Sequence, residues 1–230
     1  MNLLAIETST ECCSVALVCG GDLIVRSEVV PRRHAELLLP MCDAVLAEAG
    51  VVRRQLDAIA VGRGPGAFTG VRLAISAAQG IALALDIPVV PVSSLAALAQ
   101  DAPADSRTIL AVIDARMGEV YSAAFRRHAG SRLEALGPET VGTAERLALP
   151  IQASWSVVGT GWASYAPMLR LRLGQEPLFA DGARYPQAAA VARLALQELA
   201  MGQGVSAEHA LPVYLRDKVA LTTAERQLAG

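Results

Sequence analysis

The feature that most constrains this chain is a strand pattern that appears twice, once in each half. Residues 3–7 form a short apolar strand that ends in an acidic residue, and a brief turn leads directly into another strand. Residues 108–114 repeat that arrangement. Each half then contains an apolar strand that runs into glycines, at 59–62 and 156–159. Two matches at similar offsets indicate a repeated unit of the form β-β-β-α-β-α.

Two such units facing each other predict a duplicated two-lobed α/β fold, the actin-like (ASKHA, ribonuclease H-like) architecture, with the acid-ended turns lining a cleft. A polar stretch at 101–105 that contains a proline indicates the boundary between the lobes. We therefore expect a first lobe at 1–103, a second lobe at 104–205, and a tail at 206–230 that returns to the first lobe. A doubly wound sheet fits poorly, because the first three strands follow one another without helices.

Composition narrows the classes of partner. Hydrophobic residues make up 53% of the chain and aromatic residues 4%, which suits helices packed on sheets. The net charge of −2 is too small to hold nucleic acid without a basic partner. The four cysteines, Cys12, Cys13, Cys19 and Cys42, form no CxxC pair and are interpreted as core residues in a reducing compartment. We see no signal peptide and no uncharged run long enough to cross a membrane, so we expect a cytoplasmic protein.

A glycine-rich loop at 62–67 follows the fourth predicted strand. It matches GxGxxA, but Pro65 interrupts it and no Lys-Ser/Thr follows, so neither a dinucleotide fingerprint nor a Walker loop is expected. Two interpretations stay open: a tight turn that needs glycine, or an anion contact at the start of the next helix. Candidate contacts for an anion or a nucleotide come from this loop and from the first acid-ended turn: Glu7, Thr8, Ser9, Arg63, Gly64 and Gly66.

The sequence patterns typical of a catalytic site are missing. An actin-like ATPase would place Asp, followed closely by Gly, where this chain has Glu7-Thr8-Ser9-Thr10, and the longer carboxylate would enter the phosphate space. The three histidines, His34, His128 and His209, stand alone, without a second His at i, i+4. We therefore predict no catalytic residue, no metal site and no cofactor, although weak nucleotide binding in the cleft stays open.

Two helices expected in the first half, at 34–49 and from Thr69 to Leu85, are apolar nearly all round. A helix of this kind must be covered on more than one side, by the rest of the fold or by another molecule. Between these alternatives, we favour a helical patch that docks on another subunit. The residues assigned to this patch are His34, Leu37, Leu38, Met41, Val45, Arg72, Ile75, Ala78 and Gln79.

Several segments, in their order and spacing, resemble the bacterial TsaB (YeaZ) family over essentially the whole chain. The most specific segment is Gly-Pro-Gly-x-Phe-Thr-Gly-x-Arg at 64–72, although the related catalytic TsaD family has a similar one. The segments that carry the resemblance are residues 1–10, 14–17, 34–40, 60–73 and 212–216.

The resemblance implies a role in making threonylcarbamoyladenosine beside the anticodon of tRNAs that read ANN codons. In that pathway a TsaD-like transferase uses a metal held by a histidine pair, and a TsaE-like ATPase joins the assembly. The resemblance makes this chain a non-catalytic scaffold that docks on the transferase through its two N-lobe helices, meets tRNA through the complex, and forms a homodimer when alone. The isolated His34, with Leu38 four residues on, agrees with a lost metal site.

Two other functions compete with this one. A small-molecule kinase or ATPase of the sugar-kinase class would share the predicted fold, but the Glu7 turn argues against it. A metallopeptidase-like protein is the second alternative, and the missing metal ligands argue against that activity.

Overall fold

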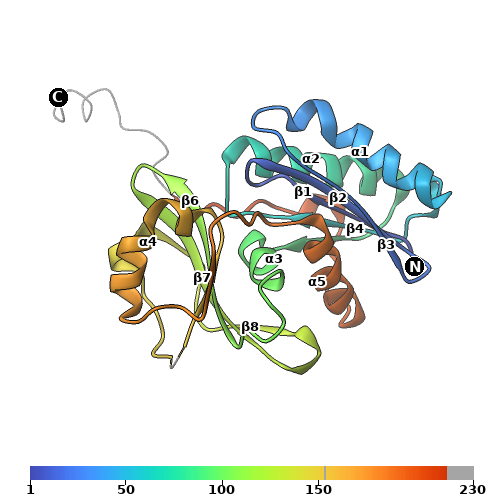
Figure 1. The fold of residues 1–230 in the computed structure, drawn as a ribbon. Helices are drawn as coiled ribbons and strands as arrows, with labels where there is room; N and C mark the ends of the chain where they lie inside the picture. Colours follow the sequence, from blue (N-terminus) through green and yellow to red (C-terminus); the bar gives the residue numbers. More distant parts are fainter. Residues whose placement is uncertain (153, 217–230) are drawn as a thin grey trace, which may run out of the picture.

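The strand pattern of the sequence forms two mixed sheets with helices on their faces (Figure 1). A computed structural model describes residues 1–152 and 154–216. The elements of the first half are β1 (Leu3–Glu7), β2 (Cys12–Cys19), β3 (Asp22–Val29), α1 (His34–Ala49), β4 (Ala58–Gly62), α2 (Phe68–Leu85), β5 (Val89–Val92) and α3 (Ser94–Gln100). The elements of the second half are β6 (Thr108–Arg116), β7 (Glu119–Arg127), β8 (Leu133–Ala135), β9 (Thr140–Thr143), β10 (Ser156–Val158), α4 (Thr160–Leu173), β11 (Phe179–Asp181) and α5 (Ala188–Ala200).

The strand order of the first sheet is β3-β2-β1-β4-β5, and the corresponding order of the second sheet is β8-β7-β6-β10-β11. The strand β9 pairs with β7 outside this path. In each sheet the central strand, β1 or β6, is antiparallel to the next strand in the chain and parallel to a later one. This repeat confirms the predicted α/β two-lobed fold. The second half departs from the predicted unit in one respect, because no long helix like α1 stands between β8 and β10.

Alternation along the central strands explains why both faces of each sheet are covered. In β1, Leu4 and Ile6 point to one core, while Leu3 and Ala5 point to another. The strand β6 divides in the same way, with Ile109 among the side chains on one face and Leu110 among those on the other. Strands that are apolar on both faces are typical of sheets with helices on each side. Helices α1 and α2 cover the outer face of the first sheet (Figure 1).

The last helix of each half packs on the other half's sheet. Side chains of α3, including Leu95 and Leu98, join the core that lines β6 and β7. Side chains of α5, including Val191 and Ala195, join the core formed by β1, β4 and β5. The expected second lobe at 104–205 included α5, but its apolar side chains lie against the first sheet. The two helices therefore form the layer between the sheets.

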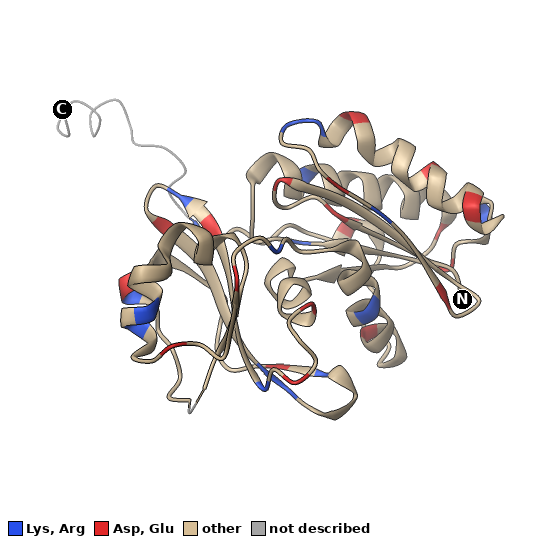
Figure 2. Ribbon diagram, in the orientation of Figure 1, with Lys and Arg blue, Asp and Glu red and all other residues tan. Residues whose placement is uncertain are grey.

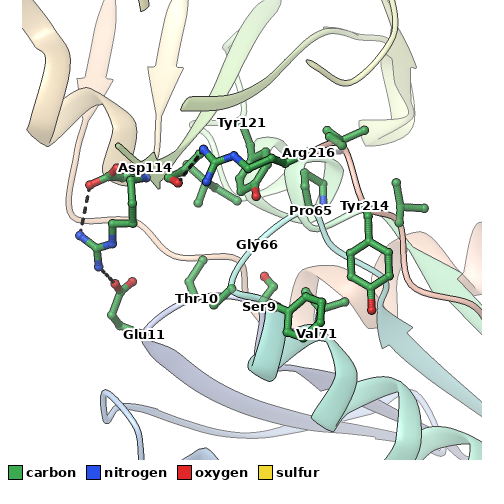
Figure 3. A pocket seen from close by; sticks show the side chains of 17 residues that line it. Ser9, Thr10, Glu11, Pro65, Gly66, Val71, Asp114, Tyr121, Tyr214 and Arg216 are labelled. Carbon is green, nitrogen blue, oxygen red and sulfur yellow. Dashed lines mark hydrogen bonds and ion pairs between the residues drawn. The ribbon is translucent and has the colours of Figure 1, made fainter. Parts of the chain in front are cut away.

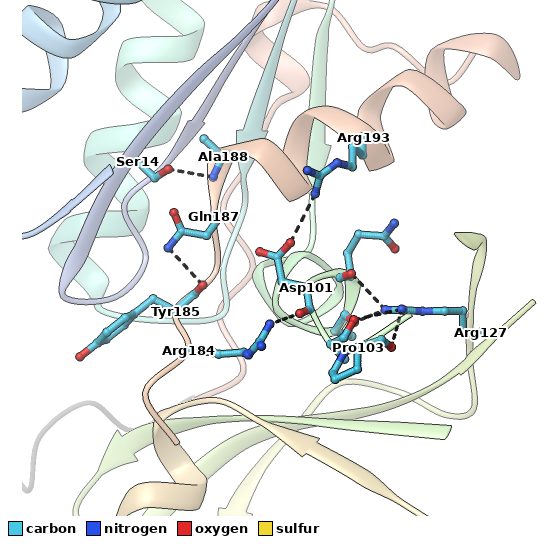
Figure 4. A network of polar contacts seen from close by, with 12 residues as sticks. Ser14, Asp101, Pro103, Arg127, Arg184, Tyr185, Gln187, Ala188 and Arg193 are labelled. Atoms are coloured by element: carbon cyan, nitrogen blue, oxygen red, sulfur yellow. Dashed lines mark hydrogen bonds and ion pairs between the residues drawn. The ribbon is translucent and has the colours of Figure 1, made fainter. Parts of the chain in front are cut away.

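A polar network holds this middle layer together (Figure 4). Arg127 of β7 is 7% exposed, and its guanidinium donates hydrogen bonds to carbonyls at the end of α3. Cations stabilise the carbonyl end of a helix, where the backbone acceptors lack partners. Asp101, just past α3, accepts a hydrogen bond from Arg193 of α5 at 3.4 Å. The accepting carbonyls are those of Ala99, Gln100, Ala102 and Pro103.

The segment after α5 returns to the first lobe, as predicted for the start of the tail. Val205 forms a bridge with Val89 of β5, and Ala207 and Ala210 lie in the core under α1 and α2. The Val213 N–H then donates to the Arg63 carbonyl at 2.9 Å. The predicted tail extends to 230, and its residues 217–230 lie outside the described residues.

The cysteines behave as the sequence suggests. All four are free, and Cys12, Cys13 and Cys42 are buried. Burial raises the pKa of the Cys13 thiol to about 11 and that of Cys42 to about 12. These two thiols stay protonated near neutral pH and serve as small apolar side chains.

Candidate functional site

The glycine-rich loop packs directly on the turn that follows β1. Three glycines at four-residue intervals, Gly62, Gly66 and Gly70, make this contact. A Cβ atom placed on any of them would lie closer than 3.0 Å to an atom of residues 7–9. Real Cβ atoms do not tolerate such contacts, so each position requires glycine for close approach. Only Gly64 in this loop has a left-handed backbone, with φ +90°. The pairs in close approach are Gly62 with Glu7, Gly66 with Ser9, and Gly70 with Thr8.

Glu7 is a buried carboxylate at the centre of this contact. One of its oxygens accepts the Ser9 backbone N–H at 2.6 Å, and the other accepts the Ser94 hydroxyl at 2.8 Å. Burial raises the pKa of the Glu7 carboxyl above its ordinary value, against the opposing effect of these hydrogen bonds. The side chain therefore joins β1 to the start of α3, and its carboxylate lies against Gly62.

Other residues of the predicted anion set have structural partners. The Thr8 hydroxyl donates to the Gly70 carbonyl at 2.7 Å. The Ser9 carbonyl accepts the Ala67 N–H at 2.7 Å. Arg63 instead points toward the second half, where its guanidinium pairs with Glu139 at 3.3 Å. The structure thus brings Glu7, Thr8, Ser9 and Gly66 together and turns Arg63 away, while anion or nucleotide binding by this set stays a prediction.

A cavity of about 260 Å³ lies between the lobes, beside this turn (Figure 3). Its walls come from the β1–β2 turn, the glycine-rich loop, the β6–β7 turn and residues 213–216. Arg116 crosses the lobe boundary here, with its guanidinium 2.5 Å from Glu11 and 3.3 Å from Asp114. Arg216 makes a second connection, to Glu119 at 2.5 Å. The Arg116–Glu11 ion pair therefore connects the two acid-ended turns, and Arg216 connects the segment after α5 to β7.

At the edge of this cavity, Arg72 lies over two aromatic rings. Its guanidinium carbon is 3.6 Å from the ring centre of Phe68 and 5.4 Å from that of Tyr214. Its Nε also donates to the Tyr214 hydroxyl at 2.6 Å. Arg72 is exposed and was assigned to the docking patch, and sequence reasoning missed both of its aromatic neighbours.

Four residues of the predicted docking patch point the other way, into the core. Leu38, Val45, Ile75 and Ala78 are at most 4% exposed and pack with the first sheet. They have no surface left for a partner, so the assignment of these four is corrected. The error arose because the helices are apolar on both sides, and periodicity alone does not say which side the sheet covers.

The remaining residues of the predicted patch lie at or near the surface. Leu37 and Met41 of α1 are partly buried at the edge of the core. Gln79 of α2 donates its side-chain amide to the Ala210 carbonyl at 3.1 Å. His34 begins α1, and its Nε2 is buried without a hydrogen-bond partner among the described residues.

The apolar surface that α1 and α2 do expose lies on their outer side. Leu39 of α1 is 56% exposed and Leu83 of α2 is 75% exposed, and neither was assigned to the docking patch. We call this surface the outer face. Along it, α2 carries one charged side chain, Arg72, as the sparse colouring of that helix shows (Figure 2). The exposed residues of the outer face are Leu39, Ala44, Gly80, Leu83 and Ala84. Partly buried side chains at its edge, which also pack against the core, are Leu37, Met41, Leu73, Ala77 and Ile81.

The outer face also explains the high hydropathy of α2. By length and composition alone, with 18 residues and a mean hydropathy of 1.5, α2 could cross a membrane. In the structure its inner side packs on the first sheet, and only a third of its residues are buried. The helix is therefore an element of the core with an unusually apolar exposed side. Over residues 1–152 and 154–216, no group of three or more His, Cys, Asp or Glu side chains could hold a metal ion.

Comparison with known proteins agrees with this architecture. The family model for TsaD, tRNA N6-adenosine threonylcarbamoyltransferase, matches residues 25–223. The chain is 42% identical over 231 aligned residues to the tRNA threonylcarbamoyladenosine biosynthesis protein TsaB of Escherichia coli, with 96% of each chain covered. TsaB of Haemophilus influenzae is 38% identical, with 95% of each covered.

Among solved structures, YeaZ from Pseudomonas aeruginosa superposes with a TM-score of 0.87 at 48% identity. That match covers 93% of this chain and 99% of the other. Coverage at these levels extends over both lobes. This chain belongs to the TsaB (YeaZ) family.

Proposed function

We propose that this chain is a non-catalytic scaffold subunit in the synthesis of threonylcarbamoyladenosine. This modified nucleoside lies next to the anticodon of tRNAs that read ANN codons. Its relatives in Escherichia coli and Haemophilus influenzae are named for tRNA threonylcarbamoyladenosine biosynthesis. In this proposal, the chain docks on a TsaD-like transferase through the outer face of α1 and α2. A TsaE-like ATPase joins the complex, and tRNA is reached through it in the cytoplasm.

The observation that carries the docking proposal is Gly80. Glycine in a helix interior costs about 1 kcal/mol relative to alanine, so its presence calls for a reason. A Cβ on any of the other glycines near the site would meet a backbone atom or, at Gly62, the Glu7 carboxylate, but a Cβ at Gly80 would meet nothing within 4 Å. Nothing in the described part of the chain therefore requires glycine there. Close approach of a second helix from outside would require it.

The neighbours of Gly80 suit the same role. Leu83 is 75% exposed one turn further on, and Ala77 and Ala84 present small side chains on that side. An apolar surface with small residues near its middle lets two helices pack at short distance. The same surface would pair two copies of this chain in the absence of the transferase, which is our proposal for the isolated protein.

A reconstituted modification reaction tests this function. The reaction contains the TsaD-like and TsaE-like proteins of the same organism, ATP, unmodified tRNA, and the enzyme that makes the activated threonylcarbamoyl donor from threonine, bicarbonate and ATP. Mass spectrometry of nucleosides measures the product. We expect little product without this chain and full product with it. Gly80→Arg should abolish the stimulation, whereas Gly137→Arg, also in open space but in a turn of the second lobe, should preserve it. Equal stimulation by both variants would contradict docking at this surface.

The isolated protein offers two further measurements. Light scattering coupled to gel filtration should show a dimer for the wild type and a monomer for Gly80→Arg. The alternative of a sugar-kinase-like ATPase is tested by ATP turnover of the isolated chain, where an ordinary enzymatic rate would displace the scaffold proposal. Stoichiometric zinc or iron in the purified protein would instead favour the metallopeptidase alternative.

A further inference from the structure

A second cavity, of about 420 Å³, lies where α1 and α2 begin. It shares Thr10, Glu11, Ala67 and Arg116 with the cavity between the lobes, but its other walls come from Thr8, from residues 31–32 and from the starts of the two helices. Figure 3 shows Thr10 and Glu11 on the side of the first cavity. We call the second space the helix-start cavity. It shares only Thr8 with the predicted anion set of the glycine-rich loop.

Two polar atoms on its wall have no partner. Thr10 is 5% exposed, and its hydroxyl makes no hydrogen bond within residues 1–152 and 154–216. The Nε2 atom of His34 is likewise buried and unpaired within the described chain. Buried polar atoms are nearly always satisfied, because an unmade hydrogen bond leaves their desolvation uncompensated. Two such atoms on one cavity indicate that a bound group completes them.

The helix ends add more donors. The helices α1 and α2 are 16 and 18 residues long, and no side chain caps the start of either one. The first N–H groups of a helix have no partner inside it, and together with the helix dipole they attract negative charge. The first turn of α2 contains no acidic residue, and the single acidic residue in the first turn of α1, Glu36, pairs with Arg33 at 3.0 Å.

The charges on the wall favour an anion. Arg32 and Arg116 contribute two cations, and Glu11 contributes one carboxylate. Glu11 is neutralised by Arg116, whose guanidinium lies at 2.5 Å and also reaches Asp114. Arg116 is shared between these two carboxylates, so Arg32 is the cation on the wall that forms no ion pair among the described residues.

We propose that the helix-start cavity binds an oxyanion, a phosphate or carboxylate group of a small molecule. The Thr10 hydroxyl, the His34 ring with its proton on Nε2, and the free N–H groups of the two helix starts are its donors. Leu73 and Ala35 line the remaining space, where a small apolar part of the same molecule fits. This proposal does not rest on docking of a partner subunit.

Calorimetric titration of the purified chain with inorganic phosphate and, in parallel, with acetate tests the proposal. Ionic strength is held constant with chloride, and the two titrations distinguish a phosphate source from a carboxylate source. We expect saturable binding of at least one of them. Thr10→Val, which keeps the shape but removes the hydroxyl, should weaken that binding about tenfold or more.

Thr108→Val is the matched control, because it makes the same substitution at a buried residue of β6 that lines neither cavity. This variant should bind as the wild type does. Thr10→Val should also melt at the same temperature as the wild type or higher without ligand, because it removes an unsatisfied buried atom. No saturable binding of either anion, binding weakened as much by Thr108→Val as by Thr10→Val, or a lower melting temperature of Thr10→Val would each overturn the proposal.

Discussion

Two Gly→Ala substitutions should have opposite effects on stability, although the chemical change is the same. At Gly66 the new Cβ would lie closer than 3.0 Å to the carbonyl oxygen of Ser9. That oxygen accepts the Ala67 N–H at 2.7 Å, so relieving the clash also breaks a backbone hydrogen bond. Overpacking costs about 1–3 kcal/mol and the lost hydrogen bond about 1 kcal/mol, so Gly66→Ala should destabilise by about 2–4 kcal/mol. At Gly80 the Cβ meets open space, and Gly80→Ala should stabilise by about 1 kcal/mol.

Differential scanning calorimetry and urea unfolding measure both variants against the wild type. For a chain of this size each kcal/mol moves the melting temperature by about 2–4 °C, so Gly66→Ala should melt roughly 4–16 °C lower and Gly80→Ala roughly 2–4 °C higher. Both substitutions restrict the unfolded chain in the same way, so their difference isolates the folded structure. An unchanged melting temperature of Gly66→Ala would refute the close packing of the glycine-rich loop on the turn after β1. A destabilising Gly80→Ala would refute the open space on which the docking argument depends.

Three other substitutions probe the core. Burial raises the pKa of Glu7 in the folded chain, so the stability that this side chain contributes is fully present below the unfolded-state pKa of 4.5 and is lost as pH rises through the folded pKa. Glu7→Gln should remove this pH-dependent loss of stability, which urea unfolding from pH 4 to 8 measures. Parallel stability profiles of the wild type and Glu7→Gln would contradict it. Arg127→Met leaves the carbonyls at the end of α3 without donors and should cost roughly 3 kcal/mol or more in urea unfolding, whereas the exposed Arg126→Met should cost little. Leu38→Asp places a charge in the core and should unfold the chain, which circular dichroism measures. A folded variant would mean that Leu38 is exposed and not part of the core.

The sequence predicted the fold well because strands and turns are local patterns. The acid-ended strand at 3–7, its repeat at 108–114 and the two strands that run into glycines lie at matching places in the two sheets. The short strands β9 and β11 were missed, because four-residue and three-residue segments carry too little alternation to be distinguished from loops. The exchange of α3 and α5 between the sheets was missed because it depends on the return path of the chain.

The candidate site could be predicted only in part. Ile75 and Leu83 lie on the same apolar helix, yet the first is buried on the sheet and the second is exposed on the outer face. Periodicity separates these two sides but does not say which of them meets the sheet. In the same way, the GxGxxA pattern indicates that the loop needs glycines but not why. The structure shows that Gly66 approaches Ser9 closely and that, within this loop, Gly64 alone has a left-handed backbone.

The central claim is that the outer face of α1 and α2 binds the transferase, and an affinity measurement tests it most directly. The dissociation constant for the TsaD-like protein of the same organism is measured for wild type, Leu83→Arg and Leu171→Arg. The two leucines are 75% and 81% exposed on helices of different lobes, so both variants should stay folded. We expect Leu83→Arg to weaken binding by about a hundredfold, as the loss of an interface anchor does, and Leu171→Arg to leave it unchanged. Unchanged binding by Leu83→Arg, with the same affinity as Leu171→Arg, would contradict the account.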